Sequence, residues 1–533
     1  MKINLQQKNY TTKEEKNQNV ILIDCESMIP ENDSVRLLNA ILEEIDYTRL
    51  YDAYSLKGTK PAVEPKIMFK ILVYAYLNGI YSTRKIADAC RRDINFIWLL
   101  SGEKGPHRST VARFRTKRLK GILGEMFGQF IKLLKEYGEI QYKNLFEDGT
   151  KIESAANRYT FVWRKTIEKN EAKMHIKIKE LVDEINESYK TEFEVREESI
   201  VEDMEEVGKY LENKRVEDNI EFVNGKGKRK SEIQKFTEPL NEYKERQAGY
   251  DESKEILGER NSYSKTDNDA TFMRMKDDHM QNGQLKPAYN VQIGVEAEYI
   301  VGVGVYENRN DLGTMIPFLD RLEESLGVRY ENIVADAGYE SEENYKYLEK
   351  NGQTSYIKPQ NYDKGVNKKD IGKRENMEYD EKTDEYKCYK GRILKKKGET
   401  TRTSATGYES EITIYECEDC SGCEHKEKCT KAQGNKKMQV SKEFVKKREE
   451  SLANITTETG KLLRVNRSIQ VEGAFGVIKS DRGFDRFETR GKENVEIEIM
   501  LVCLGYNISK LHSKIQSGRC GQYLHELKEK IEA

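Results

Sequence analysis

Two aspartates stand where a protein could use them to hold a divalent cation. Asp148 follows the apolar pair 145–146, and Asp336 follows the apolar run 333–335. A glycine comes one or two residues later in each case, as it does where a buried strand ends in a turn. Asp is also a common turn former, so either residue alone is compatible with a purely structural role. The two together indicate a shared site at one edge of a sheet.

A third acid, Glu472, lies in a segment with the periodicity of a helix. Val471, Phe475 and Ile478 recur at i, i+4 and i+7 and form one apolar stripe. Glu472 and Lys479 are also seven residues apart, so they share the neighbouring face. Two strands and a helix can bring three carboxylates onto Mg²⁺, because each ion needs only one or two protein oxygens.

The residues around these acids resemble the DDE transposases of the IS1182 insertion-sequence family, within the broader IS4/IS5-like group. The resemblance runs from about residue 30 to about residue 512. Its motifs are specific in combination and weak singly. They are Asp148-Gly149-Thr150-Lys151-Ile152-Glu153, then 156–163 with Asn157, Arg158 and Trp163, then Asp336-Ala337-Gly338-Tyr339, and Glu472 with six residues before Lys479.

The resemblance implies a reaction and a set of roles. Asp148 would bridge two Mg²⁺ (or Mn²⁺) ions per active site, Asp336 would complete one ion and Glu472 the other. Two metals about 4 Å apart activate an attacking oxygen and stabilise a leaving one in phosphoryl transfer. The implied partner is double-stranded DNA, nicked at the terminal inverted repeats and joined through the freed 3′-hydroxyl to target DNA. A homodimer in the synaptic complex and a bacterial cytoplasmic, nucleoid-associated location are also implied.

Related transposases carry a residue signature on the helix of the third acid, and this chain matches only the part that follows Glu472. Lys479 fits the expected glutamate-x6-lysine spacing and is predicted to meet a DNA phosphate. The Tyr and Arg expected before the glutamate would fall at Val465 and Ser468, and neither is present. Arg464 and Arg467 are the candidate substitutes, and we include Arg467 among the predicted DNA contacts. Tyr339 is either a DNA-contacting aromatic or a packing residue.

Charge is segregated although the net charge of the 533 residues is only -2. Residues 82–121 hold eleven Lys or Arg against three acids, a density that suits phosphate contacts. Short helices with Ser82 and Ser109 as caps and a basic last helix resemble a helix-turn-helix. The alternative is a packed helical domain used for dimerisation. The predicted DNA contacts in this region are Arg108, Arg113, Arg115, Lys117 and Arg118.

The order of the remaining elements predicts an α/β protein. A strand at 140–163, a hairpin turning at 296–298, a helix at 312–326 and strands near Asp336 and at 354–359 are typical of a mixed, ribonuclease-H-like sheet. Its first and fourth strands should be adjacent at the centre, which would bring Asp148 and Asp336 together. Ahead of it we expect helices at 34–46, capped by Ser34, and at 65–78.

These elements divide the chain into five predicted parts. They are a helical DNA-binding domain (1–135), a catalytic core (140–163, 262–375 and 440–515), a charged helical hairpin inserted at 164–260, a cysteine-rich insertion at 376–435 and a tail at 516–533. The N-terminal residues look disordered and lack the apolar core of a secretory signal. The 65–78 helix is too short and too charged to span a membrane.

Five of the nine cysteines fall between residues 388 and 429. Four follow the spacing C-x2-C-x2-C-x5-C, which suits a tetrahedral zinc site that stabilises a small domain. An iron-sulfur cluster and plain reduced thiols are the alternatives. The candidate ligands are Cys417, Cys420, Cys423, Cys429 and Cys388, with His425 as an outside candidate.

Two other function classes share these features. A ribonuclease-H-like DNA nuclease would keep the three acids but need no domain that recognises element ends. A domesticated DNA-binding protein without transposition would tolerate loss of Glu472, and all three acids are intact here.

Overall fold

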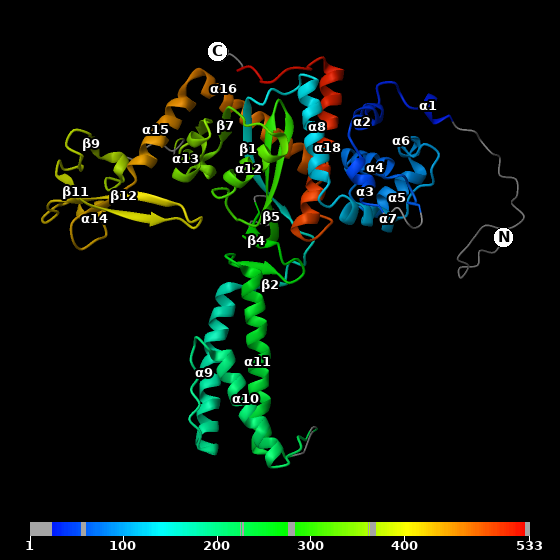
Figure 1. Cartoon of the computed structure of the whole chain (residues 1–533). Coiled ribbons are helices and arrows are strands. Elements are labelled where there is room, and N and C mark those ends of the chain that lie inside the picture. Colours follow the sequence, from blue (N-terminus) through cyan, green and yellow to red (C-terminus); the bar gives the residue numbers. More distant parts are fainter. Residues whose placement is uncertain are drawn as a thin grey trace, which may run out of the picture.

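A mixed β-sheet forms the centre of the computed structural model, which describes residues 24–54, 60–223, 225, 229–275, 283–360, 362 and 369–527 (Figure 1). The strand order is β6-β5-β1-β7-β8, and a further short strand, β4, pairs with the start of β5. Their bounds are β1 Asn144–Glu153, β4 Thr271–Arg274, β5 Leu285–Glu296, β6 Tyr299–Tyr306, β7 Asn332–Ala335 and β8 Thr354–Ile357.

Strand directions in this sheet are those of a ribonuclease-H-like fold. β5 runs antiparallel to β1 and β6, whereas β7 is parallel to β1 and β8. The predicted adjacency of the first and fourth core strands is confirmed, since Phe146 lies opposite Val334. The hairpin also turns where predicted, with Ala297 and Glu298 at positive φ.

Helices cover the sheet and complete its core. The helix predicted at 312–326 is α12 (Met315–Leu326), which starts three residues later than predicted. It contacts the sheet through Phe318, which lies against Gly294 and Gly302. The others are α13 (Glu342–Lys350), α15 (Lys442–Thr456), α16 (Glu458–Arg467) and α18 (Lys492–Ser517). α18 also packs on the N-terminal helices, and Gly505 permits this because a Cβ there would lie 2.6 Å from the Leu77 nitrogen.

The N-terminal part is all helical, as predicted. Its helices are α1 (Cys25–Met28), α2 (Ser34–Glu43), α3 (Thr48–Asp52), α4 (Pro65–Leu77), α5 (Thr83–Arg92), α6 (Ile94–Leu99), α7 (Arg108–Arg113) and α8 (Leu123–Glu136). Two predicted caps are wrong by one or two residues. Asp33 rather than Ser34 caps α2, and His107 rather than Ser109 caps α7, because their side chains accept the first free N–H groups.

The charged insertion contains three helices rather than the predicted hairpin of two. They are α9 (Arg164–Tyr189), α10 (Ile200–Glu217) and α11 (Glu232–Leu257), and they project from the sheet as one arm (Figure 1). Leu181, Leu211 and Leu240, one from each helix, help form a core separate from that of the sheet. Strands β2 (Phe161–Trp163) and β3 (Ser262–Ser264) pair at its base and join its two ends.

The cysteine-rich insertion is built on a five-stranded antiparallel sheet with its own core. The strands are β9 (Glu378–Asp380), β10 (Glu385–Lys387), β11 (Ile393–Thr403), β12 (Glu409–Cys417) and β13 (Lys437–Val440), and the short helix α14 covers Lys426–Cys429. In the described parts of the chain, no helix combines the length and apolarity needed to cross a membrane. Residues 1–23 lie outside the described residues, so the prediction of a disordered start falls outside them too.

Candidate active site

Asp336 directly follows β7, as predicted, whereas Asp148 lies within β1, the parallel neighbour of β7, and not at the predicted strand end. Asp148 Oδ1 accepts a hydrogen bond from the Gly149 nitrogen at 2.8 Å. Asp336 caps a single 3₁₀ turn, where its Oδ1 accepts from the Gly338 nitrogen at 2.7 Å. The other oxygen of each carboxylate, Oδ2, faces the same neighbour, Arg467.

The guanidinium of Arg467 lies among all three predicted acids. One of its terminal nitrogens is 2.9 Å from Asp148 Oδ2 and 3.7 Å from Asp336 Oδ2, and the other is 3.8 Å from Glu472 Oε1. The Asp148 and Arg467 side chains are only 11% and 14% exposed, whereas that of Glu472 is 61% exposed. Three carboxylates that are distant in sequence thus converge around one cation.

The helix that carries Glu472 is not a regular α-helix. It contains π-helical turns at Ser468–Glu472 and Val477–Asp481, separated by the short α17 (Gly473–Gly476). A π turn bonds residue i to i+5, so it brings Arg467 and Glu472 onto one face although five positions separate them. This explains how Arg467 reaches the site in place of the arginine that the sequence lacks at 468. Arg464 stacks on Tyr362 instead, 4.7 Å from its ring centre.

Behind the two aspartates lies a buried polar layer that sequence reasoning missed. Glu147 is fully buried, and neither of its carboxyl oxygens has a hydrogen-bond partner among the described residues. Burial, and then the charges of Asp311, Asp148 and Asp336, raise the pKa of Glu147 well above its usual value. Strand alternation alone predicts only that Glu147 faces away from Asp148.

Asp311 and Tyr339 belong to the same layer. Asp311 Oδ1 accepts from Gln292 Nε2 at 2.8 Å, and the Tyr339 hydroxyl donates to Gln292 Oε1. Tyr339 is fully buried, so of its two predicted roles the structure supports packing. A Cβ at position 149 would meet Gln292 and Asp311, which is why a glycine follows Asp148.

The predicted basic contacts fall into two groups. Arg108, Arg113 and Lys117 are exposed on and just after α7. Arg118 is half-buried against the Tyr54 ring, 4.4 Å from its centre. Arg115 is buried, and its guanidinium donates to the Tyr76 hydroxyl at 2.8 Å and to the Tyr81 carbonyl at 3.0 Å. We therefore do not assign Arg115 to DNA.

Lys479 approaches the strand that carries Asp148. Its ammonium donates to the Lys151 carbonyl at 3.2 Å, three residues beyond Asp148 along β1. This hydrogen bond holds the Lys479 ammonium against β1, on the side of Asp148 that leads towards Glu153.

The predicted thiol ligands are near one another. Burial raises the pKa of the Cys429 thiol, and the charge of Lys436 lowers it. Cys388, Cys420 and Cys423 lie close enough to Cys429 to raise its pKa further. Burial and the neighbouring Cys420 thiol raise the pKa of Cys417 to about 12. All the cysteines in the described part of the chain are free thiols.

Within the described ranges, no group of three or more His, Cys, Asp or Glu side chains is arranged to hold a metal ion. At the acid cluster this is explained by Arg467, whose guanidinium lies between the carboxylates and holds them apart from a common ion. The donor chemistry still suits Mg²⁺, a hard cation that prefers carboxylate oxygens.

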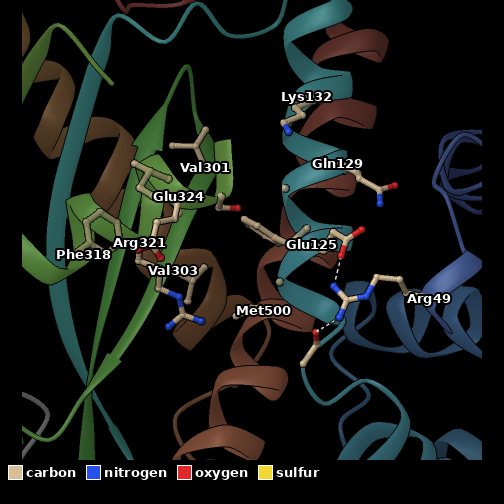
Figure 2. A pocket seen from close by; sticks show the side chains of 17 residues that line it. Arg49, Glu125, Gln129, Lys132, Val301, Val303, Phe318, Arg321, Glu324 and Met500 are labelled. Atoms are coloured by element: carbon tan, nitrogen blue, oxygen red, sulfur yellow. Dashed lines mark hydrogen bonds and ion pairs between the residues drawn. The ribbon is translucent and has the colours of Figure 1, made fainter. Parts of the chain in front are cut away.

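A surface cavity of about 500 Å³ lies elsewhere, between α8, β6 and α12 (Figure 2). Its lining includes the charged residues Arg49, Glu125 and Arg321 and the apolar residues Phe318 and Met500. None of the three predicted acids lines this cavity.

Comparison with known protein families gives two matches. Residues 387–512 match a transposase DDE domain, and residues 23–117 match a second transposase domain, DUF772. This is the architecture of IS1182-family transposases. The resemblance stated from the sequence is thereby confirmed, and the domains indicate an insertion-sequence transposase with metal-dependent activity. No curated protein and no solved structure matches the chain.

The two matched ranges contain different parts of the predicted site. The DDE range contains Glu472, Lys479 and the thiols, whereas Asp148 and Asp336 precede it. The second range contains α1 to α7 and ends at Lys117, within the basic segment.

Proposed function

We propose that the protein binds the terminal inverted repeats of an insertion sequence, cleaves DNA at the element ends and joins the 3′-hydroxyl ends to target DNA. The observation that supports this most directly is the convergence of Asp148, Asp336 and Glu472 around Arg467, each within 4 Å of its guanidinium. A cation is thus already held where the reaction needs positive charge.

In this proposal the three acids hold two Mg²⁺ or Mn²⁺ ions. When bound, the ions would activate the attacking oxygen and stabilise the leaving oxygen of the scissile phosphate. Asp148, on the central strand, would contact both ions, with Asp336 and Glu472 on either side. The buried layer of Glu147, Gln292 and Tyr339 behind β1 would hold these carboxylates rigid.

The remaining residues would position DNA. Lys479 lies beside β1 near the acids, where its ammonium could bind a phosphate adjacent to the cut. The exposed Arg108, Arg113 and Lys117 would bind the backbone of the terminal repeats, with Arg118 at the edge of this surface. Two copies, one for each element end, would form a homodimer in the synaptic complex. We also propose that the Cys388–Cys429 thiols bind a structural Zn²⁺.

Asp336→Asn tests the catalytic assignment because it removes a charge but keeps the side-chain volume. We expect loss of Mg²⁺-dependent cleavage of labelled terminal repeats, with binding to the same DNA within a few fold of wild type. Asp52→Asn, at an exposed position in α3, is the matched control and should cleave normally. Normal cleavage by Asp336→Asn would refute the assignment. Cleavage without preference for the repeats would favour a simple nuclease.

A further inference from the structure

A groove lined with aromatic and basic side chains lies at the base of the helical arm, where α9 and α11 leave the sheet. It consists of a cavity of about 340 Å³ and a neighbouring one of about 510 Å³, which share Trp163, Thr166 and Asn170. Phe161, Trp163 and Tyr250 supply three rings to the first cavity. No part of the predicted active site lines either cavity.

The rings on the β2 side are held in place from behind. The Trp163 ring packs on Phe272 at a centroid distance of 5.8 Å, and the Arg309 guanidinium lies 5.9 Å from its centre. Phe161 also packs on Phe272 but remains 50% exposed, and nearby Tyr159 is 76% exposed. Large exposed rings on a rigid support are costly in water and are suited to stacking against a flat ligand.

All the charged residues that line the two cavities are basic. Lys165, Lys169 and Lys173 are spaced four residues apart on α9 and therefore lie on one face, and Arg246 and Lys265 complete the lining. No acidic residue lines either cavity. Among the described residues none of the four lysines forms an ion pair, although ion pairs are common elsewhere on this highly charged surface. Arg246 has only a loose contact with Glu242 at 3.7 Å.

Basic side chains lie along the chain between the acid cluster and the start of the groove. Beyond Asp148, β1 continues for five residues to Glu153, about 17 Å at ~3.4 Å per residue. Lys479 donates to a backbone carbonyl along this stretch, and Arg486 and Arg490 donate to carbonyls just after it, at Ser154 and Ala155. Lys479, Arg486 and Arg490 thus place positive charge along the stretch of chain that leads from Asp148 towards the groove.

We propose that this groove binds a single-stranded segment of the DNA, with unpaired bases stacked on Phe161 and Trp163 and phosphates bound by the α9 lysines. Exposed rings beside unpaired cations are the combination that binds single strands without reading sequence. Duplex DNA fits this lining poorly because its bases are stacked on each other and hide their faces. The site rests on the proposed function, since it supplies a contact for DNA that is opened near the cut.

The chain offers a direct optical test because it has only two tryptophans, Trp98 and Trp163. In Trp98→Phe full-length protein, Trp163 is the sole indole reporter. A twelve-nucleotide oligothymidine, added without divalent metal, should quench its emission, and a duplex of equal length should quench it far less. Absence of quenching by the single strand, or equal quenching by the duplex, overturns the proposal.

The charge contribution is tested by changing Lys165, Lys169 and Lys173 together to Gln. We expect the oligothymidine to bind at least tenfold more weakly. The slope of log K against log[salt] should also become shallower by about 2, because each lost phosphate contact changes it by ~0.7. The matched control changes three exposed lysines of the same arm outside the groove, Lys179, Lys209 and Lys235, to Gln. Equal affinity of the two triple variants contradicts the proposal.

These measurements are independent of catalysis. Phe161→Ala, at a half-exposed ring, should reduce quenching without unfolding the protein, which circular dichroism can verify. Asp336→Asn should bind the oligothymidine like wild type. If wild-type protein failed to cleave the terminal repeats, the catalytic proposal would be refuted and the proposed single-strand site would stand. If the oligothymidine failed to quench Trp163, the single-strand site would be refuted and the catalytic proposal would stand.

Discussion

Arg467 is predicted to compete with metal for the acid cluster. Its guanidinium is within hydrogen-bond distance of Asp148 and within 4 Å of Asp336 and Glu472, so a cation that enters must displace it. Arg467→Gln keeps much of the side-chain length but removes the charge. We therefore expect this variant, without DNA, to bind Mn²⁺ more tightly than wild type.

The magnitude follows from burial. The Arg467 to Asp148 contact is a charged hydrogen bond between side chains 14% and 11% exposed, for which a net contribution of about 1.5–3 kcal/mol is typical. The contacts to Asp336 and Glu472 are longer, and these side chains are 42% and 61% exposed, so each adds well under ~1 kcal/mol. If the metal must displace contacts worth about 2 kcal/mol, the affinity of wild type for Mn²⁺ should be roughly thirtyfold lower than that of the variant.

Isothermal titration of the metal-free proteins with Mn²⁺ measures this difference. Arg464→Gln is the matched control because Arg464 lies three residues earlier and stacks on Tyr362. Its affinity should equal that of wild type. If Arg467→Gln bound Mn²⁺ no better than wild type, Arg467 would not be a competitor, and its place among the acids would have to be explained as purely structural.

Two further predictions concern the cysteine-rich insertion. Burial alone would raise the pKa of Asp384, but hydrogen bonds from Lys442 and Tyr415 lower it to about 2. Because the pKa is lowered on folding, the stabilisation by Asp384 is present above pH ~4 and is lost as the pH falls towards 2. In fluorescence-detected urea unfolding, Asp384→Asn should thus be less stable than wild type at pH 7 and show a flatter dependence between pH 4 and 2; parallel curves would contradict this. For the thiol cluster, elemental analysis of wild type should find about one zinc per chain. The zinc should be absent from Cys417→Ser and retained by Cys520→Ser, which changes an exposed cysteine outside the cluster. A wild-type protein without zinc would show that these cysteines are plain reduced thiols.

Part of the central sheet was predictable because β7 is a short apolar run followed directly by Asp336, whereas β1 was predicted to end at Asp148 but continues to Glu153. Buried runs such as 333–335 identify strands, and the order of strands and helix suffices to make the first and fourth neighbours. Helix ends were less predictable because Asp33 and His107 compete with nearby serines for the same free N–H groups. α10 was missed because its apolar residues are sparse in a charged sequence.

The candidate site was predictable in its acids but not in its cation. A regular α-helix with 3.6 residues per turn would place Arg467 and Glu472 on different faces. The sequence does not show that residues 468–472 form a π turn, so the contact between Arg467 and Glu472 could not be predicted. Glu147 was overlooked since an acid beside a predicted ligand looks like another surface charge, and only the packed structure shows it to be fully buried. The same limit applies to Arg115, whose basic neighbours are exposed while it is buried.

The position of Arg467 in the chain also bears on how the protein is made. Arg467 is synthesised 319 residues after Asp148, which at ~5–20 residues per second corresponds to roughly 15–60 s of translation. Throughout that interval a growing polypeptide carries the first aspartate without its arginine and without Glu472. A ribosome-bound fragment therefore has no assembled acid cluster, and the proposed active site forms only once the late helix has docked.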